Sequence, residues 1–186
     1  MKKIKLKVIG YWALGIFFAI DAVLGWFVAS YYFPKFPPSD DHLHMADRIV
    51  VEKALRKMTL YYKNEVVAMY DISLGFNPHG NKEKQGDGRT PEGKYNISHK
   101  NEKSKYHFSL QISYPNNQDI LNARKKQVSV GGDIVIHGYP NAMPAWMGDM
   151  FLKNKDWTEG CIAVSNKEIE QIWSYVRLGT PIEILP

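Results

Sequence analysis

The sequence contains one cysteine, Cys161, in surroundings that suit a nucleophile. Gly160 precedes it, an apolar run follows it, and a helix start comes shortly afterwards. His137 lies 24 residues upstream, at the end of another apolar run. A cysteine and a histidine carried by separate elements could form a thiol nucleophile and its base.

The chemistry of such a pair places requirements on its neighbours. Free cysteine has a pKa of about 8.5, and an imidazolium beside it favours the reactive thiolate and later protonates a leaving group. A glycine at 160 would free the backbone N–H groups of Gly160 and Cys161 to face a developing oxyanion. A third group must orient the imidazole. The carbonyl of Gly138 would serve, and Asp133 is a weaker candidate.

Spacing alone leaves a second interpretation open, in which Cys161 is a small buried apolar side chain. A metal site is disfavoured, because zinc needs three or four ligands. Neither His79 nor His107 has a helpful spacing to His137 and Cys161. We therefore expect neither a metal nor a cofactor.

Most of the elements that must position this pair are predicted to be strands. Short apolar runs with close turns favour an antiparallel meander over 48–53, 57–62 and 66–73, although 42–47 could begin a short helix. A glycine-rich loop, 75–93, is long enough to be functional or mobile. Ser165 and Glu168 form a capping box at a helix start. The other predicted elements are strands at 94–97, 107–114, 134–136 and 182–185, and helices at 119–126 and 166–176.

Length and composition fit one globular domain with a β-rich core. The chain has 186 residues, of which 45% are hydrophobic, 23% charged and 13% aromatic. Its net charge is +5, but four lysines lie in residues 1–33, which leaves 20 basic and 18 acidic residues in 34–186. This near balance argues against nucleic acid as a partner, because nucleic-acid binding needs a concentrated basic face.

The N-terminal segment, 1–33, is predicted to be a transmembrane signal anchor. Four lysines precede 26 mostly apolar residues, and a helix of about 20 such residues spans a bilayer. The lysines predict a cytoplasmic tip, so the chain would cross a membrane once and place the remainder outside the cytoplasm. A stiff, proline-rich linker, 34–46, would then lead to a domain, 47–186. Two alternatives stay open: a signal peptide cleaved near 28–30, which gives a secreted form, and a buried soluble helix.

Several motifs occur in an order that resembles one known family. His137-Gly138 is followed by Thr158-x-Gly160-Cys161-Ile162. The supporting segments are Arg89-Thr90-Pro91-x-Gly93-x-Tyr95, Ser113-Tyr114-Pro115-Asn116 and Gly131-Gly132-Asp133-Ile134-x-Ile136. Together they resemble the L,D-transpeptidase (YkuD-type) catalytic domain over about residues 47–186.

This resemblance implies a mainly β, sandwich-like domain with a few short helices, which acts on peptidoglycan in cell-wall biogenesis and cell shape. The cysteine of such enzymes attacks a stem tetrapeptide after its diamino acid, releases D-alanine and passes the acyl group to an amine or to water. By motif, Cys161 is the nucleophile and His137 the general base and acid. The Gly138 carbonyl orients His137, and the N–H groups of Gly160 and Cys161 hold the oxyanion.

One position departs from the family pattern. Many members carry arginine two residues after the cysteine, where this chain has Ala163. We expect Arg89, or a lysine of the 81–84 loop, to supply the missing charge to a substrate carboxylate. Trp146 and Trp157 could stack on substrate or pack in a lid or core. The candidate substrate-binding residues are therefore Arg89, Tyr114, Trp146, Trp157 and Thr158.

Three functions compete. The first is a peptidoglycan L,D-transpeptidase that transfers a stem peptide to an amine. The second is a hydrolase or amidase of the same fold, either an L,D-carboxypeptidase or an enzyme that releases peptidoglycan-linked protein. The third is a non-catalytic wall-binding module, against which the intact pair of Cys161 and His137 argues. The expected partners are stem peptides and the membrane, and the sequence does not indicate an oligomeric state.

Overall fold

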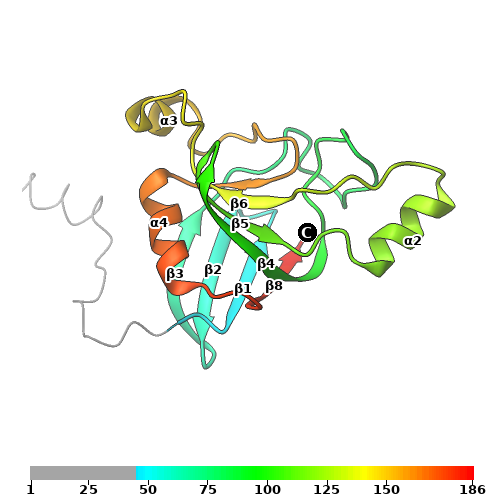
Figure 1. Cartoon of the computed structure of the whole chain (residues 1–186), viewed down its shortest axis with the longest axis horizontal. Coiled ribbons are helices and arrows are strands. Elements are labelled where there is room, and N and C mark those ends of the chain that lie inside the picture. Colours follow the sequence, from blue (N-terminus) through cyan, green and yellow to red (C-terminus); the bar gives the residue numbers. More distant parts are fainter. Residues whose placement is uncertain (1–44) are drawn as a thin grey trace, which may run out of the picture. The chain divides into compact units, whose positions relative to one another are not determined.

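The computed structural model describes residues 45–186, which fold around one eight-stranded sheet (Figure 1). They belong to one compact unit, His44–Pro186. The predicted anchor, 1–33, and nearly all of the linker lie outside the described residues and stay predictions. Within residues 45–186, no helix is both long and apolar enough to cross a membrane. Residues 45–47 are not helical.

The predicted antiparallel meander is confirmed. It consists of β1 (Arg48–Glu52), β2 (Lys57–Tyr62) and β3 (Glu65–Asp71), with β2 in the middle. Residues of β1 alternate between buried and half-buried, as expected when one face of a strand packs on the core. The last strand, β8 (Pro181–Leu185), lies parallel to β1, and this long-range pairing was not predicted.

Strand β4 (Gly93–Ser104) joins the two halves of the sheet. It pairs with β8 through its first residues and with β5 (His107–Ile112) through its later ones. Next come β6 (Val135–His137) and β7 (Ile162–Ala163), in the order β3-β2-β1-β8-β4-β5-β6-β7. An isolated bridge between Ser73 and Ala163 also ties the segment after β3 to β7. The predicted mainly β class is confirmed.

Within residues 45–186, three short helices accompany the sheet. Helix α4 (Asn166–Tyr175) begins at the predicted capping box of Ser165 and Glu168 and buries Ile169 and Ile172 beside β5 and β6. Helix α2 (Asn117–Lys125) has Asn116 as its N-cap.

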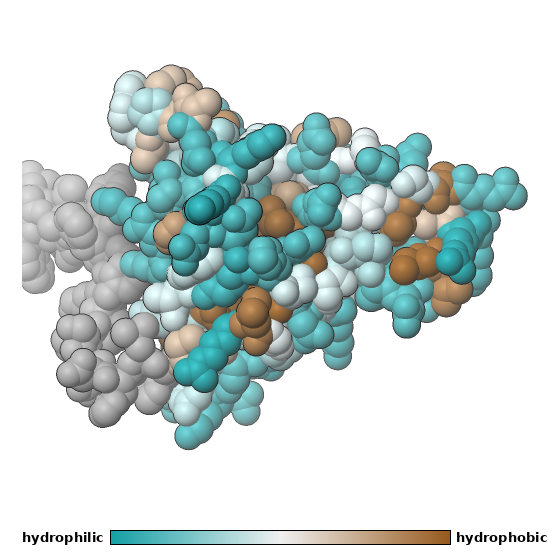
Figure 2. All heavy atoms as spheres, in the orientation of Figure 1, coloured by the Kyte–Doolittle hydropathy of each residue, from teal (hydrophilic) through white to brown (hydrophobic). Residues whose placement is uncertain are grey.

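Helix α3 (Ala145–Phe151) was not predicted as a helix. It leaves large apolar side chains exposed, and Figure 2 shows weakly apolar residues in this part of the face, with more strongly apolar residues at its centre and right. The exposed residues are Trp146, Met150 and Phe151.

A buried lysine holds the long loop between β3 and β4. The Nζ of Lys53 donates to the carbonyls of Gly80 (2.6 Å) and Thr90 (3.0 Å) and to the Glu92 carboxylate (2.7 Å). Only 2% of the Lys53 side chain is exposed. A buried ammonium needs such partners, because an unpaired buried charge is costly. The predicted loop is therefore anchored to the sheet next to β1.

Candidate active site

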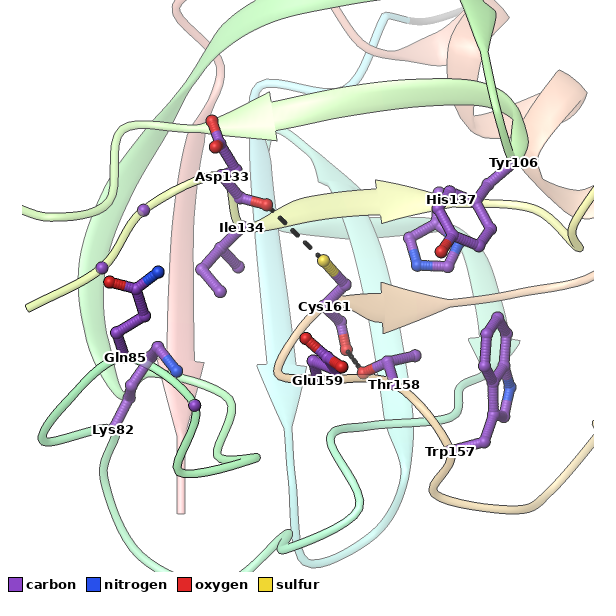
Figure 3. A pocket seen from close by; sticks show the side chains of 13 residues that line it. Lys82, Gln85, Tyr106, Asp133, Ile134, His137, Trp157, Thr158, Glu159 and Cys161 are labelled. Carbon is purple, nitrogen blue, oxygen red and sulfur yellow. Dashed lines mark hydrogen bonds between the residues drawn. The ribbon is translucent and has the colours of Figure 1, made fainter.

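The sheet register places Cys161 and His137 on one face of neighbouring strands. Strands β6 and β7 are parallel, with Ile136 opposite Ile162 and His137 opposite Ala163. Cys161 precedes β7 and lies two residues before Ala163, so its side chain points to the same face as that of His137. Figure 3 shows both side chains in one cleft.

This cleft has a volume of about 470 Å³. Cys161 lies between two walls (Figure 3): a polar wall formed by Lys82 and Gln85, and an aromatic wall formed by Tyr106, His137 and Trp157. The remaining lining residues are Gly86, Gly131, Gly132, Asp133, Ile134, Thr158 and Glu159.

His137 is buried and held in one orientation. Its Nδ1 lies 2.6 Å from the Gly138 carbonyl oxygen. Because a carbonyl only accepts hydrogen bonds, Nδ1 carries the proton and Nε2 keeps its lone pair. The Tyr106 ring lies 4.5 Å from the imidazole, centroid to centroid, and the Trp157 ring meets it edge-on at 5.6 Å.

Burial determines the charge state of this imidazole. It lowers the pKa of His137 to about 4, although the hydrogen bond with Gly138 acts in the opposite direction. The imidazole is therefore neutral at neutral pH and can accept a proton at Nε2.

The thiol of Cys161 is protonated at rest. Its Sγ donates to the Asp133 carbonyl at 3.6 Å. Burial raises the pKa of the thiol, and the Val135 backbone and the positive charge of Lys82 act in the opposite direction. The resting pair is thus a thiol and a neutral imidazole. The imidazolium and thiolate suggested by sequence are disfavoured, because burial penalises both charges.

The loop before Cys161 is shaped by Thr158. The Thr158 hydroxyl donates to the Cys161 carbonyl at 2.7 Å and accepts from the Gly160 N–H at 3.2 Å. Gly160 has a φ of 128°, and a Cβ there would lie 2.6 Å from the Arg89 carbonyl oxygen, so only glycine fits. Of the two predicted oxyanion donors, the Gly160 N–H is already engaged. The Cys161 N–H has no acceptor among residues 45–186.

The other predicted site residues fall into two groups. Trp157 and Thr158 line the cleft. Arg89 does not, because its guanidinium donates to the Asn81 carbonyl at 3.3 Å. Tyr114 is buried outside the cleft, and its hydroxyl donates to the Val130 carbonyl at 2.9 Å. Trp146 is exposed on α3. The substrate-binding roles of all five stay predictions.

Sequence reasoning did not select several residues of the cleft, among them Gln85, Gly86, Tyr106 and Glu159. Tyr106 reaches His137 from the turn between β4 and β5, and no motif singles it out. Lys82 was included only as one of the lysines of the 81–84 loop. The sequence feature that could have singled out Lys82 is Asp87, five residues later, with which Lys82 forms a 2.8 Å ion pair. Ala163 is buried and brings no charge to the cleft.

No metal centre is evident in this part of the chain. Among residues 45–186, no three His, Cys, Asp or Glu side chains gather closely enough to hold an ion.

The sequence matches the L,D-transpeptidase catalytic domain (YkuD) over residues 46–184. The chain belongs to this family. Among curated proteins, none matches.

Solved structures share the fold of this L,D-transpeptidase domain. The helical cell shape determining protein Pgp2 from Campylobacter jejuni is 23% identical with a TM-score of 0.58, over 75% of this chain and 47% of Pgp2. Bd1075 from Bdellovibrio bacteriovorus is 24% identical with a TM-score of 0.52, over 77% of this chain and 51% of Bd1075. An L,D-transpeptidase from Mycobacterium smegmatis is 14% identical with a TM-score of 0.50, over 76% and 59% of the two chains.

These identities establish a common fold and no more. In Pgp2 and Bd1075, the matched region is about half of the protein.

Proposed function

We propose that this chain is a peptidoglycan L,D-transpeptidase that uses Cys161 as its nucleophile and His137 as its general base and acid. One observation carries the proposal: the thiol and an imidazole with a free Nε2 share one face of neighbouring strands and one cleft. Family membership supports the substrate class, which is the stem peptide of the bacterial wall.

Acylation begins from the neutral pair. Nε2 of His137 takes the thiol proton while Sγ of Cys161 attacks the carbonyl carbon of the diamino acid in a stem tetrapeptide. The carbonyl oxygen becomes an oxyanion, which the free Cys161 N–H stabilises. The imidazolium then gives its proton to the nitrogen of D-alanine, the C–N bond breaks, and a thioester remains.

Deacylation repeats these steps with an acceptor. Neutral His137 removes a proton from an incoming amine, which attacks the thioester, and the thiol of Cys161 is restored with that proton. Asp133 and Glu159 also line the cleft. Their negative charges attract a cationic amine, which releases one proton to solvent before His137 removes the next, and so favour transfer over hydrolysis.

A hydrolase is the second candidate, because Ala163 leaves the position next to the pair without the common positive charge. Water would then attack the same thioester. In either case the N-terminal segment would anchor the chain in the inner membrane, with the catalytic domain in the periplasm. Action on the wall would also influence cell shape.

The test uses the purified full-length chain and defined muropeptides with mass-spectrometric detection. Crosslinked dimers or exchanged D-amino acids indicate a transpeptidase, whereas shortened stems alone indicate a hydrolase. An acyl adduct on Cys161 identifies the donor. Cys161→Ala should abolish every product while the circular dichroism spectrum stays unchanged.

A control variant removes a different sulfur-containing side chain. Met150→Leu lies on the exposed face of α3 and should keep wild-type rates. If Cys161→Ala instead kept full activity in cells and on muropeptides, the enzymatic proposal would be wrong and the wall-binding alternative would gain support.

A further inference from the structure

Among residues 45–186, one positively charged side chain lines the cleft. Three charged residues line it, and two of them, Asp133 and Glu159, are acidic. The third, Lys82, has only 3% of its side chain exposed. A lysine is rarely buried to this degree unless a partner compensates its charge.

Lys82 is held in place by Asp87. The ammonium donates to one carboxylate oxygen of Asp87 at 2.8 Å. The same carboxylate accepts from three backbone N–H groups, those of Glu83, Lys84 and Arg89. Burial of Asp87 opposes its ionisation, but these four donors together lower its pKa to about 2.

The hydrogen bond to Asp87 therefore leaves other N–H donors of the Lys82 ammonium available. An ammonium carries three N–H donors, and Asp87 is its one hydrogen-bond partner within the described part of the chain. Since backbone donors already compensate the Asp87 charge, the remaining ammonium donors can bind a second anion. Figure 3 shows the Lys82 side chain in the polar wall, across the cleft from His137.

This arrangement orients the substrate. His137 must protonate the leaving nitrogen, so the released part of the peptide lies toward the aromatic wall (Tyr106, His137 and Trp157). The part retained in the thioester then extends from Cys161 toward the polar wall. A carboxylate that meets Lys82 must belong to this retained part.

We propose that Lys82 determines specificity by binding a carboxylate of the retained acyl part of the stem peptide. The inference rests on the proposed function. Two groups supply this chemistry: the side-chain carboxylate of a dicarboxylic diamino acid, and the α-carboxylate of the γ-linked D-glutamate before it. The free carboxylate of the leaving D-alanine is excluded by its side of the cleft.

The experiment measures kcat/KM of the full-length chain on four synthetic tetrapeptides. The first is the free acid with a dicarboxylic diamino acid. The others have one carboxylate converted to an amide: the diamino-acid side chain, the D-glutamate α-carboxylate, or the C-terminus. Enzymes are the wild type, Lys82→Met and the control Lys84→Met, whose side chain comes from the same loop but does not line the cleft.

Lys82 should make the wild type prefer the free acid over one of the two retained-side amides. A charge-assisted hydrogen bond predicts a preference of about 10- to 100-fold. Lys82→Met should reduce this ratio to about 1, whereas Lys84→Met should keep it. General damage to the fold cancels in a ratio of two substrates. If Lys82→Met does not fold, the neutral pair Lys82→Met with Asp87→Asn replaces it.

Two results overturn the inference. In one, Lys82→Met slows all four peptides by the same factor and shifts the pH profile, so Lys82 acts on the thiol alone. In the other, the C-terminal amide is the peptide that the wild type discriminates against. If the wild type turns over none of the peptides, the proposed function itself fails, and that outcome is distinct from both.

Discussion

Protonation of His137 should cost this fold much of its stability in mild acid. The imidazole is buried with a pKa of about 4, against 6.5 in its ordinary state. The unfolded chain therefore takes up this proton first as the pH falls. The stability that comes from the neutral imidazole is present above about pH 6.5 and is lost as the pH falls toward 4.

The size of the loss follows from the shift. Each pKa unit corresponds to about 1.4 kcal/mol, so His137 should contribute a loss of about 3 kcal/mol between pH 7 and pH 4. Domains of this size are stable by about 5–15 kcal/mol, so this loss is easily measured. Solvent does not screen this effect, because only 2% of His137 is exposed.

The assay compares the pH dependence of urea unfolding in three proteins. These are the wild type, His137→Asn and the control His99→Asn, whose side chain is exposed on β4. Asparagine at 137 can still donate to the Gly138 carbonyl but cannot be protonated. Titrating groups other than His99 and His137 are common to all three proteins and cancel in the comparison.

We expect the wild type and His99→Asn to lose about 3 kcal/mol more than His137→Asn between pH 7 and pH 4. Equal slopes in all three proteins would refute the reasoning, because they would show that the imidazole is solvated in the folded state.

Two further predictions concern the loop that carries Lys82. Lys53→Met should lower the free energy of unfolding by about 3 kcal/mol, because it removes the ammonium that holds three loop acceptors. Lys94→Met, at a side chain that is 81% exposed, should change it by less than about 0.5 kcal/mol in the same urea titration. Gly75→Ala should cost about 3 kcal/mol, because its Cβ would lie 2.0 Å from the Gly88 carbonyl oxygen. A Cβ at Gly86 would meet no atom within 4 Å, so Gly86→Ala should lower the free energy of unfolding by only about 1 kcal/mol, because φ at this residue is positive. Similar melting temperatures for the two alanine variants would contradict this prediction.

Local patterns predicted much of the fold. The meander β1–β3, the strand that ends at His137 and helix α4 each follow from periodicity and turn or cap residues within the element itself. The capping box of Ser165 and Glu168 is an example, because both hydrogen bonds form between residues three apart.

Long-range pairings could not be predicted in this way. The parallel contact between β1 and β8 joins residues more than 120 positions apart, and β4 extends well beyond its predicted end to serve both halves of the sheet. Helix α3 was missed, and its N-cap Pro144 forms no side-chain cap hydrogen bond that sequence could reveal.

For the site, residue types and spacing were enough to select Cys161 and His137 and the chemistry they could perform. They could not give the protonation states, because those depend on burial by Tyr106 and Trp157, which come from distant segments. Nor could they separate Lys82, which lines the cleft, from Arg89, which turns away from it. Sequence specifies which groups are present, but a charge's energy depends on what surrounds it, and only the packed tertiary structure determines that environment.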